Sequence, residues 1–173
     1  MRVFICAACA LGLVACGGAK TEDATNELRP HMEKVYAAWA TLDSSKPAPY
    51  YAKDAGLAFF DVAPLQYHGW QEYEDGFKKV SADWASAKVT VGPDLKAYKR
   101  DDLAWVTYTL DLDITMKNGD PMKAQARGTD ILEKRGDNWM IVHEHVSMPM
   151  AEPAPAPKPE AAKPVHHKHK GKK

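Results

Sequence analysis

The fold of this chain is decided by residues 103–148, which read LAWVTYTLDLDITMKNGDPMKAQARGTDILEKRGDNWMIVHEHVSM. Apolar and polar residues alternate strictly from Val106 to Met116, and this period of two is typical of a strand with one buried and one wet face. Asn118-Gly119 and the segment 135–138 are strong hairpin turns. The stretch therefore predicts three long antiparallel strands, over 103–117, 122–134 and 139–148.

The residues upstream of these strands predict two long helices and several shorter elements. Apolar residues at helical spacing predict a helix over 26–43, with Pro30 in its first turn, and a second helix over 70–84. The shorter elements are a helical piece at 50–54 and strands at 57–62, 88–91 and 97–99. Helices followed by a run of antiparallel strands indicate an α+β domain, whose helices cover one face of a curved, mostly antiparallel sheet.

The beginning of the chain resembles the signal of a bacterial lipoprotein. Met1-Arg2 is a short positive start, residues 3–14 are apolar, and Leu13-Val14-Ala15-Cys16 places small residues before a cysteine. The resemblance implies a signal peptide at 1–15 and palmitate or similar acyl chains on Cys16, which would hold the protein at a membrane. Residues 16–24 would form a lipidated tether, and we expect no fixed structure over 17–24. An ordinary secretory signal is the alternative.

The two residues after the cysteine bear on the expected location. Gly17 and Gly18 stand where an aspartate would favour the inner membrane under the sorting rules of lipoproteins. The resemblance therefore implies a cell-envelope protein on the periplasmic face of the outer membrane.

The formal net charge of zero conceals an uneven distribution. Residues 16–149 carry 16 basic and 21 acidic side chains, and they lack a basic stripe with interleaved aromatics, so nucleic acid is not an expected partner. Residues 150–173 are rich in proline, alanine and lysine, have a net charge of +4, and include a His-Lys cluster at 166–170. We predict a disordered tail there, which contacts an anionic envelope surface, binds a transition metal weakly or has no specific partner.

Two stretches of the chain resemble the SnoaL-like branch of the nuclear transport factor 2-like superfamily. One runs from Tyr51-Ala52-Lys53-Asp54 through Phe59-Phe60-Asp61-Val62-Ala63-Pro64 to Gly69-Trp70, and the other from Arg127-Gly128-Thr129-Asp130 to Ser147. The resemblance spans residues 25–149 and implies a cone-shaped fold, with a pocket between the helices and the concave sheet and a homodimer formed through the sheet. It implies no particular reaction, because this scaffold serves isomerases, dehydratases and plain binding proteins.

The ketosteroid isomerase branch of that superfamily implies a candidate catalytic set. Asp61 follows the first strand, where those enzymes place a carboxylate base. Tyr36 on the first helix and Asp130 on the penultimate long strand lie near the positions of the two oxyanion donors. The alternative is that Asp61 is only a turn or cap residue.

A second group of candidates consists of residues expected to line the pocket. His143 and His145 are predicted to share one strand face with Trp139 and Ile141, because side chains two residues apart point the same way. The two histidines could bind a metal or act as acid and base, but no third ligand is evident, so we predict no metal and place them at the pocket or the dimer seam. The other expected pocket walls, which as plain core would look identical, are Tyr51, Phe60, Tyr67 and Trp70.

These observations favour noncatalytic binding of a small, partly apolar molecule or of an envelope component, without a cofactor. The first alternative is an isomerase- or dehydratase-like enzyme with Asp61 as its base. The second is a dimeric interaction module with a vestigial pocket.

Overall fold

The computed structural model describes residues 19–150. The predicted signal peptide at 1–15, the predicted lipidation site Cys16 and nearly all of the predicted tail at 150–173 lie outside these residues. No helix within the described part is long and apolar enough to cross a membrane.

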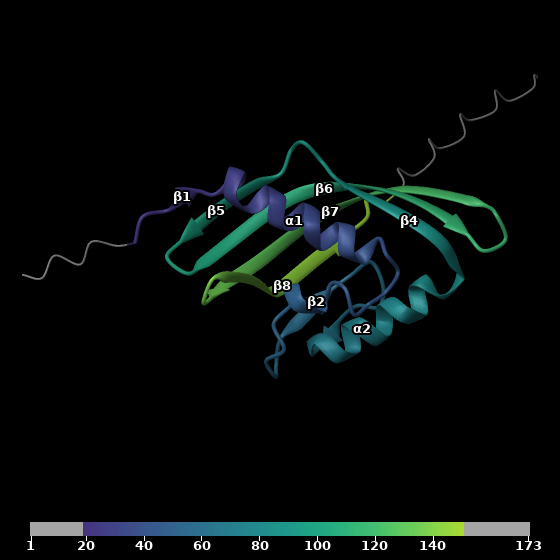
Figure 1. Cartoon of the computed structure of the whole chain (residues 1–173), viewed down its shortest axis with the longest axis horizontal. Coiled ribbons are helices and arrows are strands. Elements are labelled where there is room, and N and C mark those ends of the chain that lie inside the picture. Colours follow the sequence, from purple (N-terminus) through teal and green to yellow (C-terminus); the bar gives the residue numbers. More distant parts are fainter. Residues whose placement is uncertain (1–18, 151–173) are drawn as a thin grey trace, which may run out of the picture.

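The described chain forms two helices and one curved sheet (Figure 1). The elements in chain order are β1 (Glu22–Asp23), α1 (Thr25–Trp39), the 3-10 turn Ala48–Tyr50, β2 (Ala58–Phe60), β3 (Tyr67–His68), α2 (Gly69–Val80), the 3-10 turn Ser81–Asp83, β4 (Trp84–Val91), β5 (Lys96–Arg100), β6 (Leu103–Met116), β7 (Pro121–Arg135) and β8 (Asn138–Ser147). The strand order is β1-β5-β6-β7-β8-β2-β3, and β4 pairs with β6 beyond the end of β5. Among the strands of the described residues, β2 and β8 alone pair in parallel, so the predicted α+β fold with a mostly antiparallel sheet is confirmed.

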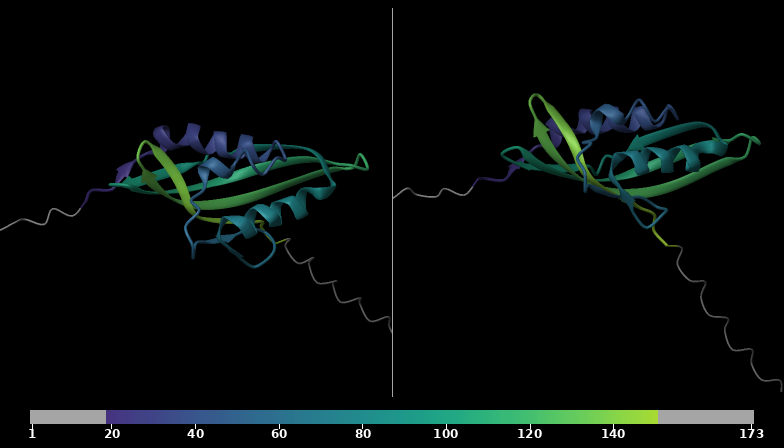
Figure 2. Two further views of the ribbon diagram at one scale, coloured as in Figure 1. Left: turned by 60° about the horizontal axis from the view of Figure 1, so that its bottom comes forward. Right: turned by 90° about the horizontal axis from the view of Figure 1, so that it is seen from below.

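The three long strands predicted from residues 103–148 are present as β6, β7 and β8. The turns between them use Gly119 and Gly136, both with positive φ, as the hairpin signals predict. Along β6 the two faces alternate as expected, with Val106, Tyr108 and Leu110 buried and the intervening threonines exposed. The buried face is the concave one: α1 lies across the sheet, and α2 lies beside β2 and β3 (Figures 1 and 2).

Both long helices are shorter than their apolar spacing predicts. α1 ends at Trp39 instead of residue 43, because the chain turns and Leu42 adopts a left-handed conformation with φ of 62°. α2 ends at Val80, where the Ser81 hydroxyl donates to the carbonyl of Phe77, and Trp84 is already the first residue of β4. Apolar spacing therefore continues past each helix to Leu42 and Trp84, which are only half-buried and lie outside the helices.

Two other local predictions are wrong. Residues 50–54 do not form a helical piece: the single 3-10 turn ends at Tyr50, and Tyr51 is extended and forms a bridge with Ile141 of β8. The predicted tether is ordered at its end, because Glu22–Asp23 pairs with β5 as β1. Ala24 is buried and donates its amide hydrogen to the carbonyl of Ala97 at 2.9 Å. The domain thus begins earlier than residue 25.

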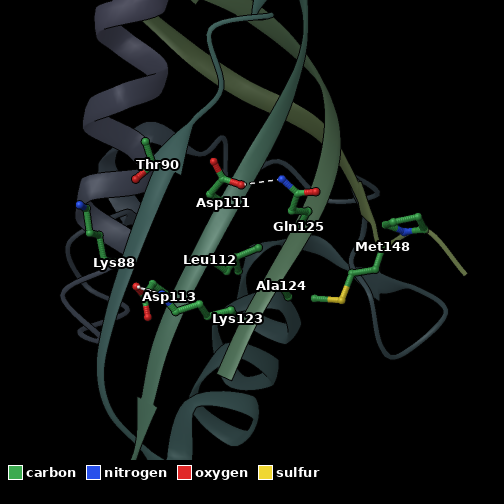
Figure 3. A pocket seen from close by; sticks show the side chains of 10 residues that line it. Lys88, Thr90, Asp111, Leu112, Asp113, Lys123, Ala124, Gln125 and Met148 are labelled. Carbon is green, nitrogen blue, oxygen red and sulfur yellow. Dashed lines mark hydrogen bonds and ion pairs between the residues drawn. The ribbon is translucent and has the colours of Figure 1, made fainter. Parts of the chain in front are cut away.

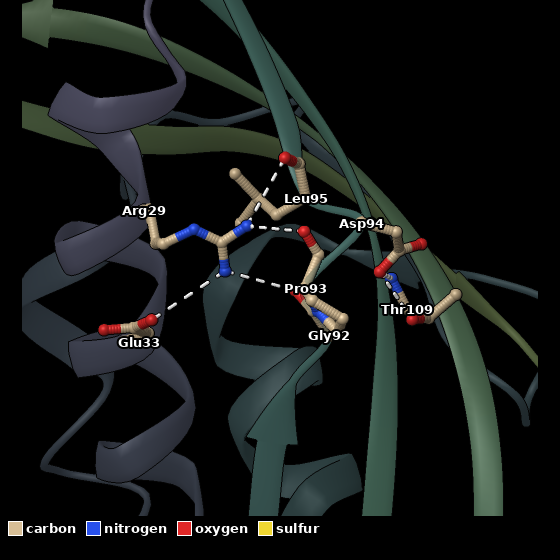
Figure 4. A network of polar contacts seen from close by, with 7 residues as sticks. All are labelled: Arg29, Glu33, Gly92, Pro93, Asp94, Leu95 and Thr109. Atoms are coloured by element: carbon tan, nitrogen blue, oxygen red, sulfur yellow. Dashed lines mark hydrogen bonds and ion pairs between the residues drawn. The ribbon is translucent and has the colours of Figure 1, made fainter.

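Arg29 of α1 fixes the connection between β4 and β5 (Figure 4). Its guanidinium donates to the carbonyls of Gly92 and Pro93, both at 3.1 Å, and to that of Leu95 at 3.4 Å. These carbonyls belong to the turn that lets β4 and β5 share one edge of β6. The Arg29 side chain therefore joins α1 to the connection between β4 and β5, the two strands that pair with the same edge of β6.

A bulge in β8 decides which of its side chains face the interior. Ile131 of β7 pairs with His143, but Leu132 pairs with Ile141, so Val142 is an extra residue in β8. A bulge of this kind reverses the alternation of faces beyond it. Trp139 and Ile141 are buried before the bulge, and Glu144 is buried after it.

Gly128 is required by a close approach within the meander. It lies opposite Tyr108 in the pairing of β6 with β7, and a Cβ atom built at this position would overlap the tyrosine ring. The ring is itself buried and hydrogen-bonded, so it cannot move aside freely.

We therefore predict that Gly128→Ala lowers the free energy of unfolding by about 1–3 kcal/mol, the usual cost of overpacking a core. Thr129→Ala, on the exposed face of the same strand, should change it by no more than about 0.5 kcal/mol. Chemical denaturation of both variants checks this. Equal effects from the two substitutions would show that Tyr108 yields at no cost.

Candidate functional site

The interior of the cone contains a cavity of about 270 Å³ between the two helices and the concave face of the sheet. Its apolar walls come from α1, α2 and the inner-facing positions of four strands, because alternation along each strand turns every second side chain inward. The apolar lining residues are Trp39, Val62, Ala63, Phe77, Val80, Trp84, Ala87, Val89, Leu110, Leu112, Ile114, Met122, Ala124, Ala126, Val146 and Met148.

The remaining lining residues are two tyrosines and two acids, namely Tyr36, Asp61, Tyr73 and Glu144. They come from α1, the segment after β2, α2 and β8. Among the described residues that line this cavity, none is a lysine, arginine or histidine. The cavity therefore combines a largely apolar wall with hydrogen-bonding groups whose only formal charges are negative.

Glu144 is the most deeply buried acid of the cavity, with 1% of its surface exposed. Tyr51 donates to one of its oxygens at 2.5 Å, and Tyr73 donates to the other. Trp39 in turn donates to the Tyr51 hydroxyl at 2.8 Å. Burial raises the pKa of Glu144 to about 7, against the opposing effect of the two tyrosine hydrogen bonds. The carboxyl group can therefore gain or lose a proton near neutral pH.

A second buried acid, Asp130, lies directly opposite Glu144 in the pairing of β7 with β8. Tyr108 donates to its Oδ1 at 2.9 Å, while its Oδ2 has no partner among the described residues. Burial, and next the charge of Glu144, raise the pKa of Asp130 well above its usual range, so both favour its protonated form. Tyr36 is hydrogen-bonded to Tyr108. A continuous chain thus runs from the cavity through Tyr36 and Tyr108 to a buried acid.

Asp61 is the third acid of the site and the least enclosed. It follows β2, and its Oδ1 accepts the backbone N–H of Val62 at 2.7 Å. Burial nonetheless raises the pKa of Asp61. The charge of Asp61 adds to the upward shift in the pKa of Glu144 after burial, as expected for two acids that face one cavity.

A larger hollow of about 680 Å³ lies on the sheet over β4, β6 and β7 (Figure 3). Its polar groups are exposed and pair with one another: Gln125 donates to Asp111 at 2.8 Å, and Lys123 lies 3.3 Å from Asp113. We therefore assign the candidate site to the smaller cavity, where buried groups face an enclosed space. The outer sheet face is mostly polar around this hollow, but the exposed Tyr98 of β5 stacks on Trp105 of β6 farther along it. The homodimer through the sheet stays a prediction.

Comparison with protein families agrees with this geometry. A family model described as a SnoaL-like domain matches residues 29–151. The chain belongs to the SnoaL-like family. The match covers α1 from Arg29 onward, all of α2 and every strand after β1, so the whole cavity lies within the SnoaL-like domain.

Solved structures of related proteins share the fold of this SnoaL-like domain. A nuclear transport factor 2-like superfamily protein from Salmonella enterica has a TM-score of 0.68 at 12% identity, covering 76% of this chain and 94% of its own. A protein from Streptomyces avermitilis, proposed to be a dehydratase of the NTF2-like family, has a TM-score of 0.64 at 16% identity, with coverages of 73% and 96%. An NTF2-like protein of unknown function from Pseudomonas putida KT2440 has a TM-score of 0.61 at 21% identity, with coverages of 73% and 87%. A search of curated proteins gave no match.

The two acids and the tyrosine named from the isomerase resemblance lie together in the SnoaL-like domain. Asp61 and Tyr36 both line the cavity, and Asp130 lies behind Tyr36 at the end of the Tyr36–Tyr108–Asp130 chain. The hydrogen bond from Val62 also shows Asp61 as the acceptor of a local turn contact. Its geometry therefore permits both roles considered from the sequence.

The seven residues expected as pocket walls do not line the cavity. Tyr51, Tyr67 and Trp70 are buried in the aromatic core, where Tyr51 instead supports Glu144. Trp139 is also buried, and its indole donates to Glu27 at 3.1 Å. Phe60 packs edge-on against both histidine rings outside the cavity.

The prediction that His143 and His145 share a face with Trp139 and Ile141 is wrong. The extra residue Val142 reverses the faces, so His145 is exposed and His143 is partly exposed, with its Nδ1 atom 2.7 Å from the carbonyl oxygen of Ala58. Glu144, which stands between the histidines, takes the inward position. The inward position of Glu144 follows from that of Val146, two residues later on the same side of the bulge. It does not follow from that of Trp139, which lies on the other side of the bulge.

The buried acids predict a specific pH dependence of stability. A free glutamate has a pKa of 4.5, and Glu144 has a pKa of about 7 in the folded protein, so the fold binds a proton more tightly than the unfolded chain does. The stabilising effect of this proton is complete below about pH 4.5 and is lost as the pH rises through about 7. The raised pKa of Asp130 acts in the same direction.

The free energy of unfolding should therefore fall across this range in the wild type, and the fall should be smaller in Glu144→Gln and in Asp130→Asn. Asp113→Asn, on the exposed sheet face, should retain the wild-type slope. Denaturant unfolding at a series of pH values measures these slopes. An increase of wild-type stability over the same range would contradict the assignment of buried, protonated acids.

Proposed function

We propose that this SnoaL-like domain binds a small, largely apolar molecule in the cone cavity, as a lipid-anchored protein of the cell envelope. The observation that carries the proposal is the cavity itself, whose apolar walls enclose a few converging polar groups. This combination is the usual composition of a small-molecule site. A volume of about 270 Å³ suits a compact ligand of one or two rings.

The polar groups of the cavity restrict the chemistry of the ligand. Asp61 and Glu144 are acceptors when ionised, and no basic side chain of the described domain lines the cavity to offset the charge of an anionic ligand. Aromatic rings of Trp39, Tyr73 and Phe77 lie in the same wall, and such rings attract cations. The site therefore favours a lipophilic amine first and an alcohol second, and it opposes a carboxylate of the same size.

This preference can be measured with three matched probes: 2-phenylethylamine, 2-phenylethanol and 3-phenylpropanoate. Trp39 and Trp84 line the cavity, so intrinsic fluorescence should report binding directly. At a pH above 7, where Glu144 is ionised, the amine should bind most tightly and the carboxylate most weakly. Asp61→Asn should weaken amine binding roughly tenfold, the value of one charge-assisted contact, and leave alcohol binding nearly unchanged.

Asp113→Asn is the matched control, because it removes a carboxylate from the exposed sheet face and should change neither affinity. Tightest binding of 3-phenylpropanoate, or binding of all three probes that ignores Asp61, would refute the proposed ligand class.

Proton transfer is the second candidate function, and the position of Asp61 favours it. Asp61 is a partly enclosed carboxyl group with a raised pKa, in the same cavity as the Tyr36 hydroxyl. An ionised Asp61 could take a proton from the carbon beside a ligand carbonyl, while Tyr36 donates a hydrogen bond to the oxygen that gains the charge. Return of the proton to another carbon would complete an isomerisation. For Tyr36 to donate to the ligand, Asp130 in its protonated form would donate to Tyr108 and Tyr108 to Tyr36, which reverses the direction of the Tyr108–Asp130 hydrogen bond.

This second function predicts measurable exchange of α-protons. In deuterated water the protein should accelerate the exchange of the α-hydrogens of cyclohexanone, followed by NMR, and Asp61→Asn should reduce the acceleration by about 10²–10⁴-fold. Tyr36→Phe should reduce it less, and Asp113→Asn should not change it. An exchange rate that is the same for the wild type and Asp61→Asn would leave the domain as a binding protein only.

A further inference from the structure

Most of the large apolar side chains that are exposed in the described domain line the cavity or lie within three residues of one that does. Six of them form what we term the apolar collar: Val62, Leu65, Val80, Met122, Met148 and Met150. Four of the six line the cavity itself, and Leu65 borders the adjoining hollow together with Val62 and Met148. Leu65 and Met150 are each 93% exposed.

The collar is assembled from four segments that are distant in the sequence. Val62 and Leu65 follow β2, and Val80 ends α2. Met122 lies at the start of β7, and Met148 and Met150 follow the end of β8. Single exposed apolar residues are ordinary on a protein surface. Their concentration around one opening is typical of a surface that contacts an apolar partner.

The charge of the chain changes sign at the collar. Residues 16–149 have a net charge of −5, whereas residues 151–173, which follow Met150 directly, carry six lysines and two glutamates. Lysine-rich segments are attracted to anionic lipid headgroups, and an apolar surface inserts at the boundary between headgroups and acyl chains. An apolar collar that continues into a basic segment is therefore complementary to an anionic membrane in both respects.

We propose that the apolar collar and the basic residues 151–173 dock together on an anionic lipid membrane, with the mouth of the cavity against the bilayer. The collar side chains enter the lipid and the lysines bind the headgroups. An apolar ligand would then pass between bilayer and cavity without crossing water. This passage of ligand rests on the proposed function, whereas the docking does not.

The docking adds a second contact to any anchor at Cys16. Glu22 of β1 follows Cys16 after five intervening residues, which give a reach of at most about 20 Å. β1 lies at one end of the domain, well away from the last described residues (Figure 1). A lipid at the N-terminus therefore leaves the orientation of the mouth undetermined, and the collar would set it.

The test uses residues 16–173 with Cys16→Ser, which retain every residue of the described fold and cannot be acylated. A single cysteine is introduced by Leu65→Cys and labelled with an environment-sensitive nitrobenzoxadiazole dye. Leu103→Cys is the matched control, because Leu103 is an exposed leucine at the start of β6, away from the collar. Mixed phosphatidylcholine–phosphatidylglycerol vesicles should brighten and blue-shift the dye at position 65 and leave the dye at 103 unchanged.

Unlabelled variants then separate the collar from the basic segment. In vesicle flotation, Leu65→Ser with Met150→Ser should weaken binding by about tenfold or more, because two apolar side chains no longer enter the lipid. Leu103→Ser should bind like the parent protein. Binding should also fall at high salt and with pure phosphatidylcholine, because the headgroup contacts are electrostatic.

Three results would overturn the proposal. Absence of binding to the anionic vesicles would remove the membrane as partner. Binding that survives Leu65→Ser with Met150→Ser and is lost on truncation after residue 150 would assign it to the basic segment alone. A dimer in solution that these two substitutions convert to a monomer would assign the collar to a second copy of the chain. None of these results depends on the amine titration, so docking and ligand class can fail separately.

Discussion

The carboxyl group of Glu144 must find its hydrogen-bond partners inside the fold, and the domain is built around that requirement. Leaving a buried charged group without partners costs several kcal/mol. The partners are Tyr51, from the segment after the first 3-10 turn, and Tyr73 of α2. Trp39 of α1 bonds to Tyr51 in turn. One acid on β8 thereby fixes both helices and a connecting segment against the sheet.

Burial of Glu144 and Asp130 side by side lowers the stability of the fold at neutral pH, but it supplies acids with raised pKa values beside the cavity. Asp130 and Glu144 are paired residues on adjacent strands, and the charge of Glu144 makes ionisation of Asp130 less favourable. Two apolar residues of similar volume would fill the same space without that cost. Acids with raised pKa values next to a cavity are instead typical of functional sites. The cluster is therefore better explained by what the cavity holds than by the packing of the core.

Much of the fold follows from the sequence, because alternation and turn residues act locally. The strands over 103–148 and the glycine turns between them are of this kind, and the family resemblance added Asp61, Tyr36 and Asp130. Glu144 was missed for a physical reason: the bulge at Val142 reverses the faces of β8, and nothing in the local sequence marks it. The ends of the helices were missed because apolar spacing cannot distinguish a residue buried by its own helix from one buried by the next element.

The pairing of β1 with β5 has a mechanical consequence for a chain tethered through its N-terminus. A pull on the tether is transmitted first to the short ladder of Glu22–Asp23 and to the hydrogen bond between Ala24 and Ala97, before it reaches α1. Such a ladder, loaded from one end, peels residue by residue at low force. Its release would lengthen the tether by about 10 Å at 3.3–3.6 Å per residue while the core stayed intact. In a chain tethered in this way, β1 would therefore detach first under a pull, while the cavity-bearing domain stayed folded.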